Sequence, residues 1–402
     1  MRVLLIAPQP FLEWRGSPIR VGHTAAMLAE LGHEVDLLTL PLGHPVALPG
    51  VRVVRVGNPL RIRHVPIGPS WRKLGFDLLL ALAATRLAAA ASYDVYHCVE
   101  ESAAIGWALA RRHGGRFVHE RHSDPLSHRG GPLRNLTLTL YALLEAFLLS
   151  RADSVLCTGR RLYEQAVTLR PGRPTHFVPD PPASALEASA GDVGRLAARL
   201  RSAPGESLLA YVGSFAGYQG IDLVLGGFAH AIAAGANARL LLAGGTPLDR
   251  SRCEEWLAAR GLRERVVWED GVPPDELPAL LAAADVLLCP RRSGLNPPLK
   301  LIELLKAGRP ILASDVPANR AVVDDECALL VDNEPTAWGE AMTRLLSDED
   351  LGARLAAAAR HHFDTHYALP HFRARLARAY EELAPGSLIQ SGAVPAERQD
   401  SV

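Results

Sequence analysis

The chain has 402 residues, which is long enough for two domains. Hydrophobic residues make up 48% and charged residues 21%, a balance typical of soluble globular proteins that argues against a disordered chain. The 43 basic and 43 acidic residues cancel, so the chain lacks the basic excess of a general nucleic-acid binder.

The first part of the chain alternates short apolar runs with helical patterns. Residues 3–7 are all apolar, which is typical of a strand buried on both faces of a parallel sheet. Apolar residues recur with helical spacing at 19–31, and Gly32 stands where a glycine often ends a helix. The same alternation predicts strands at 33–40, 51–56, 94–97, 116–119 and 154–158, with helices near 102–112 and 136–149.

The composition changes at residues 180–204, which begin Asp-Pro-Pro and are rich in Ala, Gly and Ser. This change predicts a linker with one short helix near 193–201. Beyond it the alternation restarts, with strands at 208–212, 239–243, 266–268, 286–289 and 311–313 and helices at 222–233, 250–260, 275–283, 298–307, 336–347 and 351–361.

The alternation as a whole predicts an α/β protein with two doubly wound domains, at 1–179 and 205–362. Such domains bind ligands at the carboxyl ends of their strands, so we expect a cleft lined by those ends. An amphipathic helix at 369–383 is expected to pack back on the first domain, and the polar residues 384–402 to form a disordered tail.

Cysteines and apolar runs indicate the compartment. The cysteines lie far apart without a Cys-x-x-Cys pair, which favours free buried thiols over disulfides or a zinc site. The N-terminal apolar run is too short for a signal peptide, and no uncharged apolar run reaches ~18 residues. We therefore expect a cytoplasmic protein.

The stretch CPRRSGLNPPLKLIELLKAGRPILASD, residues 289–315, carries the most chemical information. Asn296 suits a helix N-cap and Pro297 the first helical position, which leaves the amides of Leu299 and Lys300 free to bind an anion. The Lys300 ammonium adds a full charge, and Glu303, one turn on, could accept two vicinal hydroxyls of a ribose. A surface ion pair between Lys300 and Glu303 is the competing interpretation.

This stretch resembles the donor-binding motif of the family-4 retaining glycosyltransferases, which have the GT-B fold. It is similar to the branch with a Pro-Leu-Lys-x-x-Glu motif followed by Gly-x-Pro-Ile-x-Ala-Ser. The resemblance extends over about residues 2–383, through APQPFLEWRGSPIRV, LAELGHEVDLLTL, SYDVYHCVEE, RADSVLCTGRRL and YVGSFAGYQGIDLVLGGF.

The resemblance implies transfer of a sugar from a nucleoside-diphosphate sugar to a hydroxyl of a glycan or glycolipid, with retention of anomeric configuration. The expected role is the synthesis of a cell-surface polysaccharide or glycoconjugate. No Asp-x-Asp signature stands where a metal-dependent transferase needs one, so no metal or other cofactor is expected. The alternatives are a sugar-nucleotide binder of the same fold without transferase activity, and an epimerase or phosphorylase of the same fold.

Residue by residue, the resemblance implies that Glu303 binds the ribose and that the helix start at Leu299 and Lys300 meets the diphosphate. The sequence departs from the family at Leu295, where the common pattern has a Glu near the donor sugar. This departure leaves the sugar open.

A second departure lies in the loop that begins at Gly213. Ser214 and Gln219 stand where many members have an Arg and a Lys that neutralise the leaving diphosphate. Stabilising that charge is the largest expected catalytic contribution, so another group must supply it. The candidates are Lys300 with its helix dipole, followed by Arg291 or Arg292.

In the first domain, Gly16 and Ser17 form a loop that the resemblance implies lies over the donor phosphates. His122 is the best match to a family histidine after the strand at 116–119, with His119 as the competitor. The predicted catalytic residues are thus His122 and Lys300. Two further side chains at strand ends, His97 and Glu120, are predicted to bind the acceptor, with Glu100 and Glu101 as alternatives to Glu120.

A basic stretch at residues 61–73 has Pro, Ile and Trp interleaved and is followed by the apolar run 76–82. Such mixtures suit a membrane surface, so we hypothesise contact with the inner face of the membrane. The competing interpretation is a solvated loop leading into a packed helix. The residues predicted to make this contact are Arg61, Arg63, Trp71, Arg72 and Lys73.

Lysine is scarce in this chain, because only Lys73, Lys300 and Lys306 are lysines and all other basic residues are arginines. Lys300 belongs to the predicted anion site and Lys73 to the basic stretch. The pattern assigns Lys306 only to a helix surface.

Overall fold

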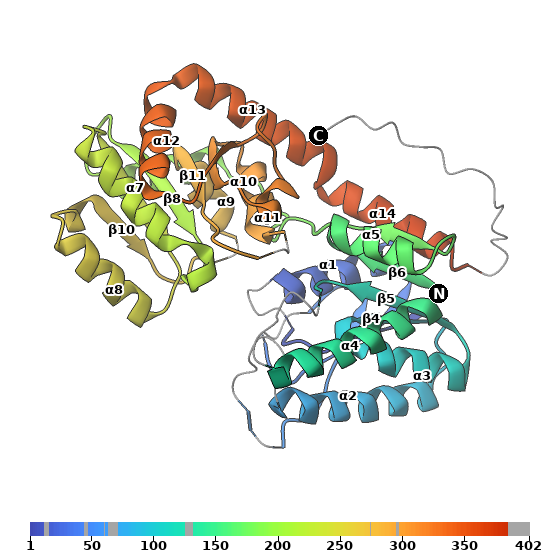
Figure 1. Ribbon diagram of the computed structural model, residues 1–402. Coiled ribbons are helices and arrows are strands. Elements are labelled where there is room, and N and C mark those ends of the chain that lie inside the picture. The colour runs from blue at the N-terminus through green and yellow to red at the C-terminus, as the bar shows by residue number, and fades with distance from the viewer. Residues whose placement is uncertain are drawn as a thin grey trace. The chain divides into compact units, whose positions relative to one another are not determined.

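The computed structural model describes residues 1–11, 16–43, 47–59, 61–62, 71–124, 132–273, 275–294 and 297–384, without the side chains of 71–74 and 132–134. The chain divides into two compact units (Figure 1). Unit 1 comprises Met1–Pro181 and the segment that begins at Pro370, and unit 2 comprises Pro182–Leu369.

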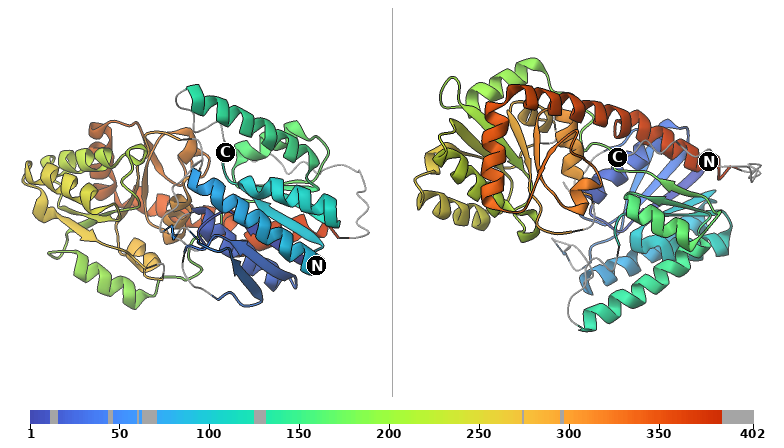
Figure 2. Two further views of the ribbon diagram at one scale, coloured as in Figure 1. Left: turned by 90° about the horizontal axis from the view of Figure 1, so that it is seen from below. Right: turned by 45° about the horizontal axis from the view of Figure 1, so that its top comes forward.

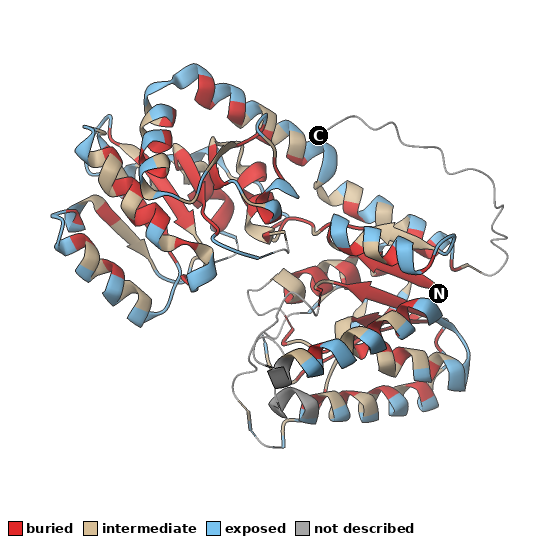
Figure 3. Ribbon diagram, in the orientation of Figure 1, coloured by how far each residue is buried: buried red, intermediate tan, exposed pale blue. Residues whose placement is uncertain are grey.

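Unit 1 is built on a parallel sheet. Its strands are β1 (Arg2–Ala7), β2 (Glu34–Thr39), β3 (Val51–Arg55), β4 (Val95–Val99), β5 (Arg116–Arg121), β6 (Ser154–Cys157) and β7 (Thr175–Phe177). They lie in the order β3-β2-β1-β4-β5-β6-β7, and each pairs in parallel with its neighbours. The central strands are buried along nearly their whole length, because helices cover both faces (Figure 3).

Helices pack on both faces of this sheet. They are α1 (Gly16–Glu30), α2 (Trp71–Ala90), η1 (Glu100–Ser102), α3 (Ala103–His113), α4 (Pro132–Arg151), α5 (Arg160–Leu169) and α14 (Leu369–Glu381). Leu4 and Ile6 of β1 face the core under α2, α3, α4 and α5. Val3 and Leu5 face the opposite core, which α1 and α14 cover.

Unit 2 repeats the plan. Its strands are β8 (Ser207–Val212), β9 (Ala238–Ala243), β10 (Val266–Glu269), β11 (Val286–Cys289), β12 (Ile311–Ser314) and β13 (Leu329–Val331), in the order β10-β9-β8-β11-β12-β13. Figure 2 shows helices on both faces of this sheet. These helices are α6 (Ala190–Leu200), η3 (Gly217–Gln219), α7 (Ile221–Ala233), α8 (Pro247–Ala258), η4 (Arg263–Arg265), α9 (Leu277–Ala282), α10 (Leu299–Ala307), α11 (Pro317–Arg320), α12 (Pro335–Ser347) and α13 (Glu349–His366).

Strand order reverses once in each sheet, and this reversal marks where a ligand is expected. In unit 1 the chain proceeds outward from β1 on one side and from β4 on the other, and in unit 2 from β8 and β11. In open α/β sheets, ligands bind beyond the carboxyl ends of the strands at such a point. Ligand contacts are therefore expected after β1 and β4 in unit 1, and after β8 and β11 in unit 2.

The prediction of an α/β protein with two doubly wound sheets is confirmed. The sequence missed β7 and β13, which are three-residue edge strands of intermediate burial, and it missed α5. All five cysteines are buried free thiols. None of the helices among the described residues is long and apolar enough to cross a bilayer.

Two helix starts differ from the sequence prediction. Gly16 and Ser17 are the first residues of α1, so they belong to a helix and not to a loop. The helix α10 begins at Leu299 after an N-cap at Pro298, so Pro297 precedes the helix. Two successive prolines explain this shift, because a residue before a proline disfavours helical dihedrals. Asn296 and Leu295 lie outside the described residues.

Candidate functional site

The segment after β8 is shaped by glycines. Gly213 has φ +152°, and a Cβ there would lie 3.4 Å from the Lys300 Nζ and 3.3 Å from the Tyr211 hydroxyl. That hydroxyl donates a hydrogen bond to the Ser214 carbonyl at 2.6 Å. Glycine at position 213 therefore lets the backbone approach the Lys300 ammonium closely.

Lys300 extends from the first turn of α10 to the segment after β8. Its Nζ donates to Gln219 Oε1 at 2.8 Å and lies 4.5 Å from the centre of the Tyr211 ring. Burial lowers the pKa of Lys300, and the charge of Arg291 adds to the effect. The structure thus brings together four residues predicted to bind the donor, which are Gly213, Ser214, Gln219 and Lys300.

Arg291 and Arg292 follow β11 and have different surroundings. Arg292 pairs with Asp222, and both side chains are exposed. Arg291 is only 8% exposed, and its Nε is buried without a hydrogen-bond partner. Its guanidinium lies over the Tyr218 ring, and burial lowers its pKa. Among the described residues no carboxylate pairs with Arg291, so its charge is left uncompensated.

The start of α10 lies beside these cations. The Leu301 amide donates to the Pro298 carbonyl at 3.0 Å. The amides of Leu299 and Lys300 precede it, at positions where a helix supplies no internal acceptor. A helix start of this kind attracts an anion, and the nearby positive charges of Lys300 and Arg291 attract an anion as well.

Glu303 already has a hydrogen-bond partner within unit 2. Its carboxylate is 5% exposed and accepts a hydrogen bond from the Ala183 amide. Burial raises the pKa of Glu303 against the effect of that hydrogen bond. Binding of a ribose at Glu303 stays a prediction, and it requires this carboxylate to share or release the Ala183 amide.

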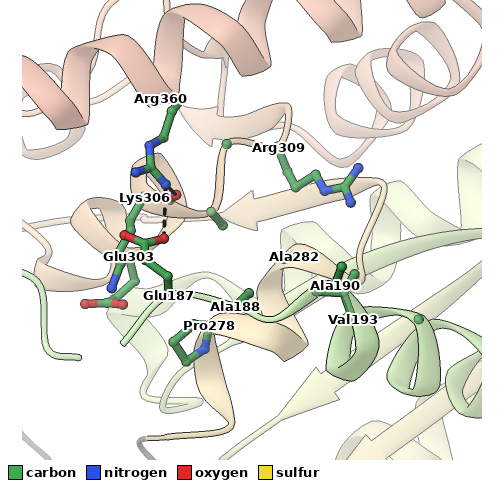
Figure 4. Close-up of a pocket in the computed structure, with 13 residues that line it drawn as sticks. Glu187, Ala188, Ala190, Val193, Pro278, Ala282, Glu303, Lys306, Arg309 and Arg360 are labelled. Carbon is green, nitrogen blue, oxygen red and sulfur yellow. Dashed lines mark hydrogen bonds and ion pairs between the residues drawn. The ribbon is translucent and has the colours of Figure 1, made fainter. Parts of the chain in front are cut away.

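A pocket of about 510 Å³ lies beside Glu303, between α6, α9, α10 and the Arg360 side chain of α13. Figure 4 shows Glu187, Glu303, Lys306 and Arg360 gathered at one end of it. Arg360 pairs with Glu187 at 3.2 Å. Lys300 is not among the lining residues, so the two predicted donor contacts of α10 face different surroundings.

Lys306 has a structural role that the sequence did not indicate. It is 5% exposed, and its Nζ donates to the carbonyls of Ser184, at 2.7 Å, and Leu186. Assigning it to a helix surface was wrong, because these carbonyls come from the segment before α6 and were not visible in the pattern of α10.

In unit 1, a buried ionic cluster centres on Glu120 of β5. Arg20 of α1 pairs with Glu120 and also donates to Asp180 at 3.1 Å. His97 joins Glu120 Oε2 at 2.7 Å and the Tyr380 hydroxyl at 2.7 Å. Burial raises the pKa of Glu120, but the Arg20 charge and hydrogen bonds from histidines outweigh it and hold the pKa well below its usual value.

His122 lies at the end of β5 and is held by two carboxylates. Its Nε2 lies 3.0 Å from Glu120 Oε1, and its amide donates to Glu100 Oε1 at 2.7 Å. The Nδ1 atom is buried and has no hydrogen-bond partner. One imidazole nitrogen is thus fixed by a carboxylate and the other is unused, which is an arrangement suited to a hydroxyl.

Glu100 stands immediately after β4, where the strand order reverses. It has φ 53°, a left-handed conformation that is uncommon outside glycine. Burial raises the pKa of Glu100 to about 7. Its carboxylate accepts from the His122 amide and the Ser123 hydroxyl.

The structure places His97, Glu120 and His119 inside unit 1. His97 and Glu120 are fully buried, so they position His122 and offer no surface for an acceptor. His119, the competitor of His122, points to the opposite face of β5, stacks on Phe117 and has a pKa lowered to about 3 by burial. The predicted acceptor contacts of His97 and Glu120 therefore lack support from their placement.

Several residues predicted to contact a membrane are not described. Arg63 lies outside the described residues, as do the side chains of Trp71, Arg72 and Lys73 at the start of α2. Arg61 is described and has φ 48°.

The sequence did not point to Arg20 or Tyr380. Arg20 was detectable in principle, because it lies on the buried face of α1 with Thr24 and Leu28 and needs a buried partner there. The contacts of Tyr380 with His97 join residues 283 positions apart, and no local pattern carries that information.

Two known families match the chain. The family described as "Glycosyl transferase 4-like domain" matches residues 15–183, and that described as "Glycosyl transferases group 1" matches residues 206–348. The chain is a glycosyltransferase of the group 1, GT4-like type. Among the described residues, no group of three or more His, Cys, Asp or Glu side chains could hold a metal ion.

Individual relatives agree with this assignment. The D-inositol 3-phosphate glycosyltransferase of Nocardia farcinica is 28% identical over 377 residues, covering 86% of this chain and 80% of the relative. The sucrose-phosphate synthase of Thermosynechococcus elongatus has a TM-score of 0.75 at 23% identity, covering 95% and 98% of the two chains. Anabaena HepE, solved in complex with UDP-glucose, has a TM-score of 0.71 at 15% identity, covering 95% and 100%. The predicted GT-B fold of this glycosyltransferase is confirmed.

Proposed function

We propose that this glycosyltransferase moves a sugar from a nucleoside-diphosphate sugar to a hydroxyl of a glycan or glycolipid, with retention of anomeric configuration. The observation that carries the proposal is a pair of cations at the strand-order reversal of unit 2, the half-buried Lys300 and the buried Arg291. Among the described residues neither cation has a carboxylate partner, and two such charges beside a helix start are electrostatically costly without an anion. A diphosphate supplies the missing negative charge.

The catalytic role of these groups follows from the charge that develops as the sugar leaves. Negative charge accumulates on the diphosphate, and fixed cations and amides aimed at it lower the barrier. Lys300 supplies the positive charge that the family pattern places at positions 214 and 219. Its hydrogen bond to Gln219 supports this role, because it holds the ammonium beside one of those two positions. Arg291 is the second cation, because Arg292 is already paired with Asp222.

The other predicted site residues complete the proposal. Glu303 is proposed to bind the ribose, and Gly16 and Ser17 to offer the first amides of α1 to the donor. His122 is proposed as a catalytic residue, because Glu120 fixes one ring nitrogen and the other has no partner. No metal or other cofactor is proposed.

The relatives suggest which donors and acceptors to try first. HepE was solved with UDP-glucose, which favours uridine diphosphate sugars in a donor panel. The Nocardia relative is named for D-inositol 3-phosphate, which adds a phosphorylated polyol to the glycan and lipid acceptors. We place the activity in cell-surface glycoconjugate synthesis in the cytoplasm, at the inner face of the membrane.

The experiment is a transfer assay with UDP-, GDP-, ADP- and TDP-sugars against these acceptors, following nucleoside diphosphate release and the anomeric proton of the product. Lys300→Gln and Arg291→Gln should lower kcat by about 100-fold or more, as removal of a transition-state donor does. Arg292→Gln is the matched control and should keep its activity. Wild-type activity in Lys300→Gln would refute the role of Lys300, and an inverted product would refute retention.

A further inference from the structure

The outer surfaces of α2 and α4, on either side of α3, expose large apolar side chains that the donor and acceptor chemistry does not use. On α4 they recur at helical spacing and form one stripe, and two more lie on α2. We call this surface the α2–α4 face, and its apolar residues are Leu78, Leu82, Leu136, Leu140, Leu143, Leu144 and Phe147. Monomeric soluble proteins rarely expose a run of adjacent large apolar side chains such as the stripe on α4, and such a surface marks an interaction site.

The exposed charges described on these three helices all have one sign. Within the described residues of the three helices, the exposed ionisable side chains are four arginines and His113. The carboxylates on the same helices are not exposed, since Glu145 is buried in an ion pair with Arg121 and Asp77 is half-buried. The arginines lie toward the carboxyl ends of the helices, and they are Arg86, Arg111, Arg112 and Arg151.

Two of these arginines pack over aromatic rings beside the patch. Arg151 lies over the Phe147 ring and Arg111 over the Trp107 ring, and the two rings meet edge to face at 5.2 Å. Aromatic rings flanked by cationic heads, next to an apolar stripe, are the arrangement that protein surfaces use at a lipid headgroup boundary.

We propose that the α2–α4 face docks on an anionic lipid surface, with the leucines entering the headgroup region and the arginines binding lipid phosphates. Charge complementarity selects this occupant, because an apolar surface whose own helices expose, among their described residues, only basic charges matches an anionic interface. A second copy of the chain is disfavoured, because two such faces would bring arginines of like sign together. This proposal does not depend on the identity of the donor.

The test uses the full chain with sedimenting vesicles of phosphatidylcholine, with and without phosphatidylglycerol. We expect binding that phosphatidylglycerol strengthens and salt weakens, since the Debye length shortens with ionic strength. Leu140→Ser with Leu143→Ser should lower the partition coefficient at least ~10-fold, because two apolar side chains no longer enter the interface. Both leucines are well exposed, at 59% and 64%, so the melting temperature should not change.

The matched control is Leu248→Ser in unit 2, where a leucine is 60% exposed on α8 outside the face. This variant should bind vesicles as the wild type does. Arg111→Gln with Arg112→Gln should remove most of the dependence on phosphatidylglycerol.

Three outcomes would overturn the proposal. They are no binding to phosphatidylglycerol vesicles at low salt, equal binding by the double serine variant, and a dimer in sedimentation velocity that this variant dissociates. Transfer to a soluble acceptor is measured in parallel, so a failure of the lipid proposal remains distinguishable from a failure of the proposed activity.

Discussion

At the scale of single residues, the main feature of the candidate donor site is that its positive charges come from segments other than the loop after β8. The loop after β8 carries Ser214 and Gln219 and so supplies no cation of its own. Lys300 enters the same region from α10, and Arg291 from the end of β11. The scarcity of lysine drew attention to Lys300. The prediction that Lys306 lies on a helix surface was wrong, because its buried contacts with backbone carbonyls depend on the segment before α6.

Glu100 gives a prediction for the pH dependence of stability. The pKa of Glu100 is about 7 in the folded chain, whereas an unperturbed glutamate, as in the unfolded chain, has a pKa of 4.5. Between pH 4.5 and 7 the folded protein therefore holds a proton that the unfolded chain has lost. The free energy of unfolding therefore falls as pH rises through this window. At about 1.4 kcal/mol per pKa unit, the loss approaches ~3 kcal/mol.

Glu100→Gln keeps an acceptor for the His122 amide and removes the titration. Denaturant unfolding at a series of pH values should show a flatter profile between pH 4.5 and 7 in this variant than in the wild type. Glu30→Gln, an exposed carboxyl at the end of α1, is the control and should keep the wild-type slope. Identical slopes for all three proteins would contradict the raised pKa of Glu100.

At the scale of elements, the contact between α7 and α12 depends on glycine. A Cβ at Gly227 would lie 2.7 Å from the Trp338 Cβ and 3.2 Å from the Gly339 amide, so the two helices leave no room for a side chain. Trp338 is fully buried in the same core as Leu223 and Phe228.

Gly227→Ala should therefore lower the free energy of unfolding by about 1–3 kcal/mol, although alanine favours a helix. Gly194→Ala on α6 is the matched control, because nothing lies within 4 Å of its added Cβ. That variant should be neutral or stabilised by up to ~1 kcal/mol. Urea unfolding measures the free energy of unfolding of both variants. Equal values for Gly227→Ala and Gly194→Ala would show that α7 and α12 can move apart without loss of stability.

Elements with a strong local signal were predictable from the sequence, and those without one were not. Strands β1, β8 and β11 are continuous apolar runs, so their burial on both faces is visible in the pattern. β7 and β13 owe their existence to pairing with β6 and β12 at a sheet edge, which a three-residue pattern does not encode. The sequence placed the first residue of α10 at Pro297, after an expected cap at Asn296, whereas the helix begins at Leu299. The two consecutive prolines explain this difference, because a residue before a proline disfavours helical dihedrals.

At the scale of the whole molecule, the two-sheet architecture followed from the alternation of strands and helices. The candidate site was only partly predictable, because motif residues such as Lys300 are local whereas their partners are not. The grouping of Lys300 with Gln219 and Tyr211 joins residues more than 80 positions apart. The cluster of Arg20, His97 and Glu120 likewise arises only when α1, β4 and β5 are placed side by side.

The central claim is that Lys300 and Arg291 hold the diphosphate of the donor. Calorimetric titration with nucleoside diphosphates and the corresponding nucleosides tests it most directly. The account predicts that Lys300→Gln and Arg291→Gln each weaken diphosphate binding about tenfold or more, because each loses a charge-assisted hydrogen bond. Nucleoside binding should not change, and Arg292→Gln should bind as the wild type does. Equal diphosphate affinity in all four proteins would contradict the account.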